Sequence, residues 1–271
     1  RINTNINAMI ATNQMTKNTA LAGSSMEKLS TGLRITKAGD DAAGLAVSEK
    51  MRAQIRGMEQ AERNVQDGIS MVQTAEGALE EAGNIAQRMR ELGVQAGNDT
   101  LSSSDRAKIK TELSELQKEM SDISKEAKFN GKELLSANAA TSTITIQAGA
   151  NSEVREIKMT NLASIANSVS ITNDLSTVGD AQAFVGKVDK ALEAINSGRS
   201  TLGTIQNRLE YTANNLTTST ENLTAAESRI RDVDVAKEMV TLSKLNILNQ
   251  ASQAMVSQAK QQPESVSQLL R

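Results

Sequence analysis

The sequence contains no histidine, no cysteine and no tryptophan, and its one proline, Pro263, lies near the end. Without histidine or cysteine, neither a Ser-His nor a Cys-His nucleophile system can form, and the usual ligands of a zinc site are missing. Aromatic residues make up 1% of the 271 residues, too few for the stacking platforms that bind single-stranded nucleic acid. The composition argues against most enzymes, and we expect no catalytic residue, no cofactor and no metal.

Charge and hydropathy exclude two further classes of protein. Thirty Lys and Arg stand against 32 Asp and Glu, a net charge of −2, whereas a nucleic-acid binder needs a basic excess. No apolar run approaches the roughly 20 residues that span a bilayer, and residues 1–15 are too polar for the apolar region of a signal peptide. We therefore expect no nucleic-acid partner, no membrane insertion, and either a cytoplasmic chain or export without cleavage.

Two long helices are predicted from apolar residues that recur at steps of three and four. The first stripe begins at Met51 and ends at Met89, within a predicted helix over about 45–95. The second stripe has the 3.5-residue period of a coiled-coil seam. Its members are Ala181, Phe184, Val188, Ala191, Ile195, Gly198, Leu202, Ile205 and Leu209.

The length of the first helix predicts the shape of the molecule. At 1.5 Å per residue it would be roughly 75 Å long, whereas a compact sphere of this chain length has a diameter of about 50 Å. We therefore expect a rod. Five glycines in the first stripe either allow close helix approach or mark bends, and the sequence leaves both open. They are Gly57, Gly68, Gly77, Gly83 and Gly93.

Capping signals locate further helix starts. Ser102 with Asp105, and Thr177 with Asp180, have the spacing of a capping box before apolar-periodic runs. A third helix is therefore predicted over about 105–127, and the second long helix is expected to begin near residue 177.

The character of the chain changes between about residues 136 and 176. Residues 143–146 alternate with period two, and turn-forming residues follow at 149–152, which predicts one or two short hairpins. The expected fold class is mostly α, a long antiparallel coiled-coil or helical-bundle rod with a small β-hairpin insert at mid-chain.

Two pairs of aspartates resemble metal ligands. Asp40 and Asp41 are adjacent, and Asp232 and Asp234 are one residue apart. Calcium needs six or more oxygen ligands, so two carboxylates without further clustered ligands are a weak signal. We therefore expect these residues to be helix N-caps, where the helix dipole favours negative charge.

The two ends are unusual because residues 2–16 and 245–259 contain no charged residue. A surface helix normally keeps charges opposite its apolar stripe, whereas an uncharged polar face suits a packed subunit interface. The alternative is a pair of disordered termini, and both descriptions hold if the ends fold on assembly. The residues expected to drive polymerisation are Ile2, Ile6, Met9, Ile10, Leu245, Leu248 and Met255.

Several segments resemble bacterial flagellin. The N-terminal signature lies at residues 26–57 as MEKLSTGLRITKAGDDAAGLAVSEKMRAQIRG, and further matching segments are 66–81, 87–100 and 129–135. The C-terminal arm matches at 208–239 and 247–271. The resemblance covers essentially the whole chain, in order and at both ends.

The resemblance implies a structural subunit that polymerises into the flagellar filament for motility. Flagellins arrange paired arms in two layers, so residues 1–40 and 233–271 would form the inner tube around a central channel. Residues 41–232 would form the surrounding layer. The variable outer domains of many relatives are missing, so the insert at 136–176 would be the outermost surface.

The resemblance also implies partners. These are sister copies in a helical homopolymer, the flagellar type III export apparatus, an export chaperone on residues 233–271, and hook-associated and cap proteins. The family is also a ligand of a vertebrate Toll-like receptor, whose contacts would be Arg88, Leu92 and Glu112. The expected location is extracellular, in the flagellum, without a cleaved signal peptide.

Three other functions remain as alternatives. A hook–filament junction protein shares the two-arm plan, but such proteins match the signature more loosely. A soluble intracellular coiled-coil scaffold would have charged ends. An enzyme is disfavoured by the composition.

Overall fold

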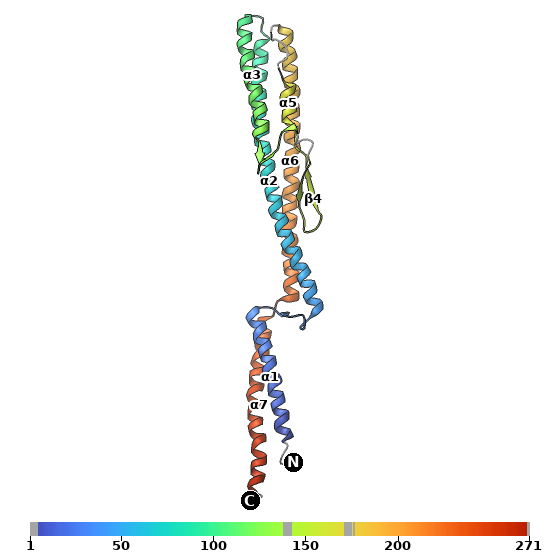
Figure 1. Cartoon of the computed structure of the whole chain (residues 1–271), viewed down its shortest axis with the longest axis vertical. Coiled ribbons are helices and arrows are strands. Elements are labelled where there is room, and N and C mark those ends of the chain that lie inside the picture. The colour runs from blue at the N-terminus through green and yellow to red at the C-terminus, as the bar shows by residue number, and fades with distance from the viewer. Residues whose placement is uncertain (1–4, 138–142, 171–174, 176, 270–271) are drawn as a thin grey trace. The chain divides into compact units, whose positions relative to one another are not determined.

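The computed structural model describes residues 5–137, 143–170, 175 and 177–269, with the backbone alone for 262–269 (Figure 1). The helices are α1 (Ile6–Thr31), α2 (Ala42–Ala96), α3 (Ser103–Glu126), α5 (Leu162–Ser168), α6 (Val178–Arg231) and α7 (Val235–Leu269). The strands β1 (Lys128–Phe129), β2 (Lys132–Glu133), β3 (Ile144–Gln147) and β4 (Val154–Ile157) form two separate antiparallel pairs. The predicted class, mostly helical with small hairpins at mid-chain, is confirmed.

The chain divides into two compact units. Unit 1 contains residues 1–54 and 221–271, and unit 2 contains residues 55–220. Both α2 and α6 contribute residues to each unit, so the division falls inside continuous helices. The layer boundaries predicted from the resemblance lie near residues 40 and 232, which differ from the boundaries of these units. They coincide with the two connectors, one between α1 and α2 and one between α6 and α7.

The core of unit 2 lies along α2 and α6, which run antiparallel. Arg90 pairs with Asp189 at 2.7 Å, and the hydroxyl of Thr217 donates to Glu62 at 3.2 Å. All nine residues of the predicted second stripe are buried. The first stripe is buried from Met58 onward. Full burial stabilises by about 1.5–3 kcal/mol for each large apolar side chain, which explains why the two stripes face each other.

The glycines of the first stripe do not interrupt α2. A Cβ on Gly93 would lie 2.9 Å from Cγ2 of Val185, and one on Gly68 would lie 2.1 Å from Cδ1 of Ile146. A Cβ on Gly57 would lie 2.9 Å from Cβ of Ala150, in the segment after β3. At Gly77 and Gly83, an added Cβ would meet nothing nearer than 3.8 Å. Close approach therefore explains three of the five, and none marks a break in the helix.

Both predicted capping boxes are present. The amide of Asp105 donates to Oγ of Ser102 at 3.3 Å, and α3 begins at the next residue. The amide of Asp180 donates to Oγ1 of Thr177 at 3.2 Å at the start of α6. The Ser102 hydroxyl also donates to the Asp105 carboxylate at 2.7 Å, which lowers the pKa of that carboxyl.

The mid-chain region contains a hairpin and a helix. β3 pairs with β4 in a register from Ile144↔Ile157 to Gln147↔Val154, as the period-two pattern predicts. The sequence did not predict α5, which begins after Asn161, whose side chain accepts from the amide of Ser164 at 2.8 Å. Residues 138–142, 171–174 and 176 of the predicted insert lie outside the described residues.

A second hairpin, β1–β2, lies before the predicted insert. Its two-residue turn is Asn130–Gly131, with φ of 49° and 77°. Both values fall in the left-handed region, which a tight type I′ hairpin turn requires and which asparagine and glycine tolerate best.

Candidate functional site

In unit 1, α1 and α7 lie side by side, blue and red in Figure 1. Nδ2 of Asn5, at the start of α1, donates to the carbonyl of Ala259 at 2.6 Å. Oγ of Ser25, near the end of α1, donates to Oε1 of Glu238 at 2.5 Å. The start of α1 therefore contacts the later part of α7, and the end of α1 contacts the beginning of α7. The two helices are antiparallel and are joined by polar contacts at both ends.

This helix pair buries few apolar side chains. The buried residues of α1 are Asn18 and Ser25, and those of α7, among its described side chains, are Leu245 and Ser252. A contiguous apolar surface on a soluble protein usually marks a site of interaction. Among the described side chains of the pair, the large apolar residues that remain exposed are Ile6, Met9, Ile10, Leu21, Met26, Val235, Met239, Val240, Ile247, Leu248 and Met255.

The residues predicted to drive polymerisation fall into three groups. Exposed on the helix pair are Ile6, Met9, Ile10, Leu248 and Met255. Leu245 is only 8% exposed, so it belongs to the interior of unit 1. Ile2 lies outside the described residues.

Sequence reasoning missed part of this surface. The prediction was restricted to the charge-free stretches at the two ends. Outside those stretches, the same two helices also expose Leu21, Met26, Met239 and Val240. Their apolar character inside otherwise polar helical segments was the available signal.

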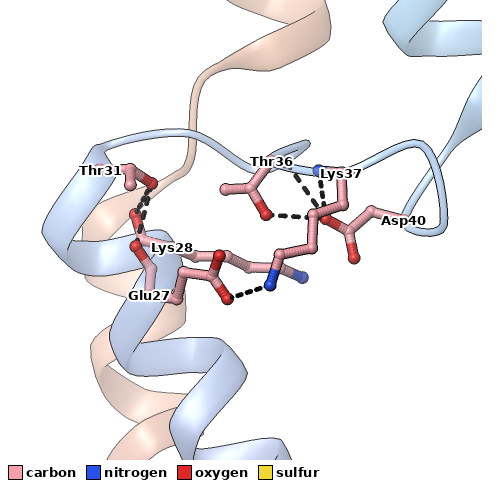
Figure 2. A network of polar contacts seen from close by, with 6 residues as sticks. All are labelled: Glu27, Lys28, Thr31, Thr36, Lys37 and Asp40. Carbon is pink, nitrogen blue, oxygen red and sulfur yellow. Dashed lines mark hydrogen bonds and ion pairs between the residues drawn. The ribbon is translucent and has the colours of Figure 1, made fainter.

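A polar network closes the segment between α1 and α2 (Figure 2). Oδ2 of Asp40 accepts from the amide and the hydroxyl of Thr36, at 3.1 and 3.0 Å, and from the amide of Lys37 at 3.1 Å. Nζ of Lys37 pairs with Glu27 of α1 at 2.9 Å. The donated hydrogen bonds lower the pKa of the Asp40 carboxyl, and the contact with Glu27 raises the pKa of Lys37. The connector is thereby tied to itself and to α1.

The four aspartates considered as N-caps behave in two ways. Oδ1 of Asp41 accepts from the amide of Gly44 at 2.8 Å, and Oδ1 of Asp234 accepts from the amide of Lys237 at 3.1 Å. The cap prediction is confirmed for these two. It is wrong for Asp40, which closes the connector, and for Asp232, whose carboxylate accepts from the Ser228 hydroxyl at 2.6 Å.

The two connectors of unit 1 are also joined to each other. The amide of Arg34 donates to the carbonyl of Arg231 at 2.6 Å, and the amide of Val233 donates to the carbonyl of Gly32 at 2.9 Å. Gly32 has φ of 72°, the left-handed conformation that ends α1. Nη1 of Arg231 also donates to Glu49 at 2.7 Å, which lowers the pKa of that carboxyl.

The residues expected to contact a receptor are partly brought together in unit 2. Arg88 pairs with Glu112 at 2.9 Å and with Glu91 at 3.1 Å; the Arg88 and Glu112 side chains are about half exposed, and that of Glu91 is 68% exposed. These carboxylates raise the pKa of Arg88. Leu92 is 2% exposed and packs inside unit 2, so its side chain offers no surface to another protein in this conformation.

Two other kinds of site receive no support from the described ranges. Within them, no three His, Cys, Asp or Glu side chains gather closely enough to hold a metal ion. None of the described helices combines the length and apolar content that crossing a membrane requires.

Family models match most of the chain. The model described as the bacterial flagellin N-terminal helical region matches residues 2–140, and the model of the C-terminal helical region matches residues 185–270. A flagellin of Halalkalibacterium halodurans is 52% identical over 272 residues, covering 100% of this chain and 99% of that protein. A flagellin of Bacillus subtilis is 48% identical, with 100% of both chains covered.

A further relative and two solved structures also resemble this chain. The flagellar filament 33 kDa core protein of Treponema phagedenis is 44% identical, covering 100% of this chain and 99% of that protein. The crystal structure of Bacillus cereus flagellin has a TM-score of 0.52 at 31% identity, covering 61% of this chain and 94% of that chain. A putative flagellar hook-associated protein of Vibrio parahaemolyticus has a TM-score of 0.60 at 12% identity, covering 71% and 100%, a likeness that shows the fold alone.

Proposed function

Because this chain belongs to the bacterial flagellin family and is a structural subunit of the flagellar filament, we propose that α1 and α7 carry the surface through which sister copies polymerise. The observation that carries the proposal is the exposure of eleven large apolar side chains on the described parts of these two helices. Burying such side chains on association removes apolar area from water at about 25 cal/mol per Å². Packing between copies is therefore favoured over isolated subunits.

No observation favours the hook-associated alternative. The three relatives reported above, at 44% to 52% identity over the whole chain, are two flagellins and a flagellar filament core protein. The likeness to a hook-associated protein is at 12% identity.

The proposed inner layer contains residues 1–40 and 233–271, and the surrounding layer contains residues 41–232. The proposal is supported by the helix interruptions at residues 32–41 and 232–234, which separate α1 and α7 from the other helices. It is also supported by the charge-free stretches 2–16 and 245–259, since enclosed helices without charge avoid the cost of desolvating ions.

The proposed partners follow from the state of α7 before assembly. Its exposed apolar residues would need to be covered in an unassembled subunit, which suits an export chaperone on residues 233–271. Export through the flagellar type III apparatus is the proposed route, because the relatives at 48% to 52% identity are flagellins. Hook-associated and cap proteins would then contact the first and last subunits of an extracellular filament.

The proposed receptor contact is the paired surface of Arg88 and Glu112, for the vertebrate Toll-like receptor that recognises the family. Both side chains are about half exposed, which supports a contact, whereas the burial of Leu92 leaves that residue a packing role. An Arg88→Asp variant is expected to lose potency in a receptor reporter assay while remaining folded. Undiminished potency would remove the assignment.

Single charge insertions test the proposed polymerisation surface. Ile6→Glu and Leu248→Glu each place a charge among exposed apolar residues, and both should prevent filament growth because the charge would be buried unpaired on assembly. Filaments are counted by electron microscopy and sedimentation, and circular dichroism reports helix content.

Val94→Glu is the matched control. Val94 is 57% exposed, comparable to Ile6, but lies in unit 2. This variant should polymerise. Normal filaments from both Ile6→Glu and Leu248→Glu would refute the proposal, as would loss of filaments in the control alone.

A further inference from the structure

A groove lies in unit 2 between β4 and α6. Its volume is about 450 Å³, and three cations line it: Arg155 on β4, Lys158 just after β4, and Arg208 on α6. Glu156 is the one acidic residue among the lining residues. We call this surface the cationic groove, and its lining charges leave a positive excess.

These three cations lack the ion pairs that neighbouring cations have. Among the residues that the structure describes, none of the three has a carboxylate within 4.0 Å. By comparison, Arg199, also on α6, lies 3.9 Å from both Glu76 and Glu80. Like charges held beside one groove repel each other, so an acidic partner would stabilise the arrangement.

One face of α6 continues the groove as far as an exposed tyrosine. Thr201, Thr204, Arg208 and Tyr211 follow steps of three, four and three, which place them on one face of the helix. Tyr211 is 75% exposed, and Val154, which also lines the groove, is 46% exposed. Exposed tyrosine and arginine together are typical of the centre of protein–protein interfaces.

The same chain carries a surface of opposite charge on α3. Glu112, Glu115, Glu119, Asp122 and Glu126 follow steps of three and four, so they share one face, which we call the acidic stripe. Glu112, Glu115 and Asp122 are paired with Arg88, Lys118 and Lys125. Within the described part of the chain, Glu119 and Glu126 have no cation within 4.0 Å.

We infer that the cationic groove of one copy receives the acidic stripe of a neighbouring copy, an inference that rests on the proposed homopolymeric function. The two surfaces differ, so the contact is heterologous, and a heterologous contact that does not close into a ring generates an open helical filament. Charge complementarity of this kind selects the register between partners and speeds their encounter. The terminal helices would supply the apolar burial, and this contact would fix how neighbouring copies align.

Charge reversal on each side, separately and together, tests the contact. The double variant Arg155→Glu/Arg208→Glu and the double variant Glu119→Lys/Glu126→Lys should each raise the critical concentration for polymerisation about tenfold, because each replaces attraction by repulsion. Combining all four changes should restore the critical concentration to near that of the unaltered chain. Sedimentation at low and high salt gives the measurement, and salt should weaken every effect.

Arg63→Glu is the control, since Arg63 is an exposed cation of α2 whose guanidinium donates to Gln60 within its own helix turn. It should leave the critical concentration unchanged. Unchanged polymerisation in both reversal variants, or failure of the combined variant to recover, overturns the inference. If the unaltered chain itself does not polymerise, the proposed function fails and the inference fails with it, which distinguishes that outcome from failure of this contact alone.

Cross-linking gives a second measurement that does not depend on assembly strength. The chain has no cysteine, so Thr204→Cys with Glu119→Cys places one thiol on each surface. A short bis-maleimide added to assembled filaments should give a ladder of covalent multimers from the double variant and none from either single variant. Thr204→Cys with Gln60→Cys is the matched pair. No ladder from the first pair, or equal ladders from both pairs, overturns the inference.

Discussion

Unit 1 and unit 2 are both built mainly from long helices but differ in where their apolar side chains lie. Among the residues that the structure describes, 38 apolar residues are buried; Ile35 and Leu245 belong to unit 1 and the others to unit 2. Of the 15 large apolar residues exposed in the described ranges, twelve belong to unit 1. Unit 2 therefore has a core of its own, whereas unit 1 leaves its apolar surface for another molecule to cover.

The difference follows from the number of elements that share each core. In unit 2, residues of α3, α5 and the β3–β4 hairpin are buried together with those of α2 and α6, for example Leu113, Leu162 and Ile157. In unit 1, α1 and α7 have mainly each other. Two helices cover only one side of each other, so a stable core needs a further layer, which a filament of sister copies would provide.

The strongest way to break this comparison is to remove α1 and α7. A chain lacking residues 1–31 and 235–271 should keep the cooperative thermal unfolding of unit 2, because its core is complete without them. It should form no filaments under conditions in which the whole chain does. Calorimetry and electron microscopy give the two measurements, and equally sturdy filaments from the shortened chain would contradict the comparison.

Truncating one leucine in each unit should give the next largest effect. Leu202→Ala in unit 2 removes a fully buried side chain and should lower the free energy of unfolding by about 3 kcal/mol. Leu21→Ala in unit 1 removes a side chain that is 56% exposed, and should change the monomer by less than about 0.5 kcal/mol. The second variant should nonetheless raise the critical concentration for polymerisation. Denaturant titration and sedimentation separate the two, and equal losses of monomer stability would refute the distinction.

Glycine substitutions sharpen the comparison at smaller energies. A Cβ on Gly57 of unit 2 would lie 2.9 Å from Cβ and 3.1 Å from Cα of Ala150, whereas one on Gly23 of unit 1 would meet nothing within 4 Å. Gly57→Ala should destabilise by about 1 kcal/mol through overpacking. Gly23→Ala should stabilise its helix in the monomer by about 0.5–1 kcal/mol. Thermal unfolding measures both, and the same sign for the two variants would be the contrary result.

The smallest effect concerns pH. The folded pKa of Asp40 in unit 1 and that of Asp105 in unit 2 are both lowered from 3.8, so each contributes stability above pH 3.8 that is lost as the pH falls through its folded pKa. Protonation of Asp40 should open the connector locally, because its carboxylate accepts three hydrogen bonds there. Protonation of Asp105 should leave α3 folded on its buried face.

Hydrogen exchange at the amides of Thr36 and Lys37 measures the opening of the connector. Exchange there, corrected for its intrinsic pH dependence, should rise below pH 3.8 before that of α3. In the Asp40→Asn variant, this pH-dependent rise in exchange should disappear. An unchanged rise in that variant would show that another group controls the connector.

Much of the fold was predictable because its signals are local or periodic. The 3.5-residue stripe of α6 predicted its nine buried residues, and the boxes at Ser102 and Thr177 predicted two helix starts. The helix α5 was missed since seven residues carry too little periodicity to distinguish helix from strand. The β1–β2 hairpin had a usable signal in Asn130–Gly131, the preferred pair for its turn.

The candidate surface was predictable in outline but not residue by residue. The charge-free ends indicated α1 and α7, yet Leu245 is buried while Leu248, on the same helix, is 39% exposed. Leu92 matched a family motif, but α2 turns its side chain into unit 2. Asp40 and Asp41 are chemically identical neighbours. Only the path of the connector directs the Asp40 carboxylate to the amide of Thr36 and the Asp41 carboxylate to the first turn of α2.

The amino-acid sequence by itself determined which segments are helical, which face of each helix is apolar, where the main caps lie and to which family the chain belongs. The tertiary structure decided which apolar faces are covered within one molecule and which are left for sister copies. The physical reason is that periodicity describes a side chain's direction about its own helix axis, whereas burial depends on whether another element, distant in sequence, packs against that side.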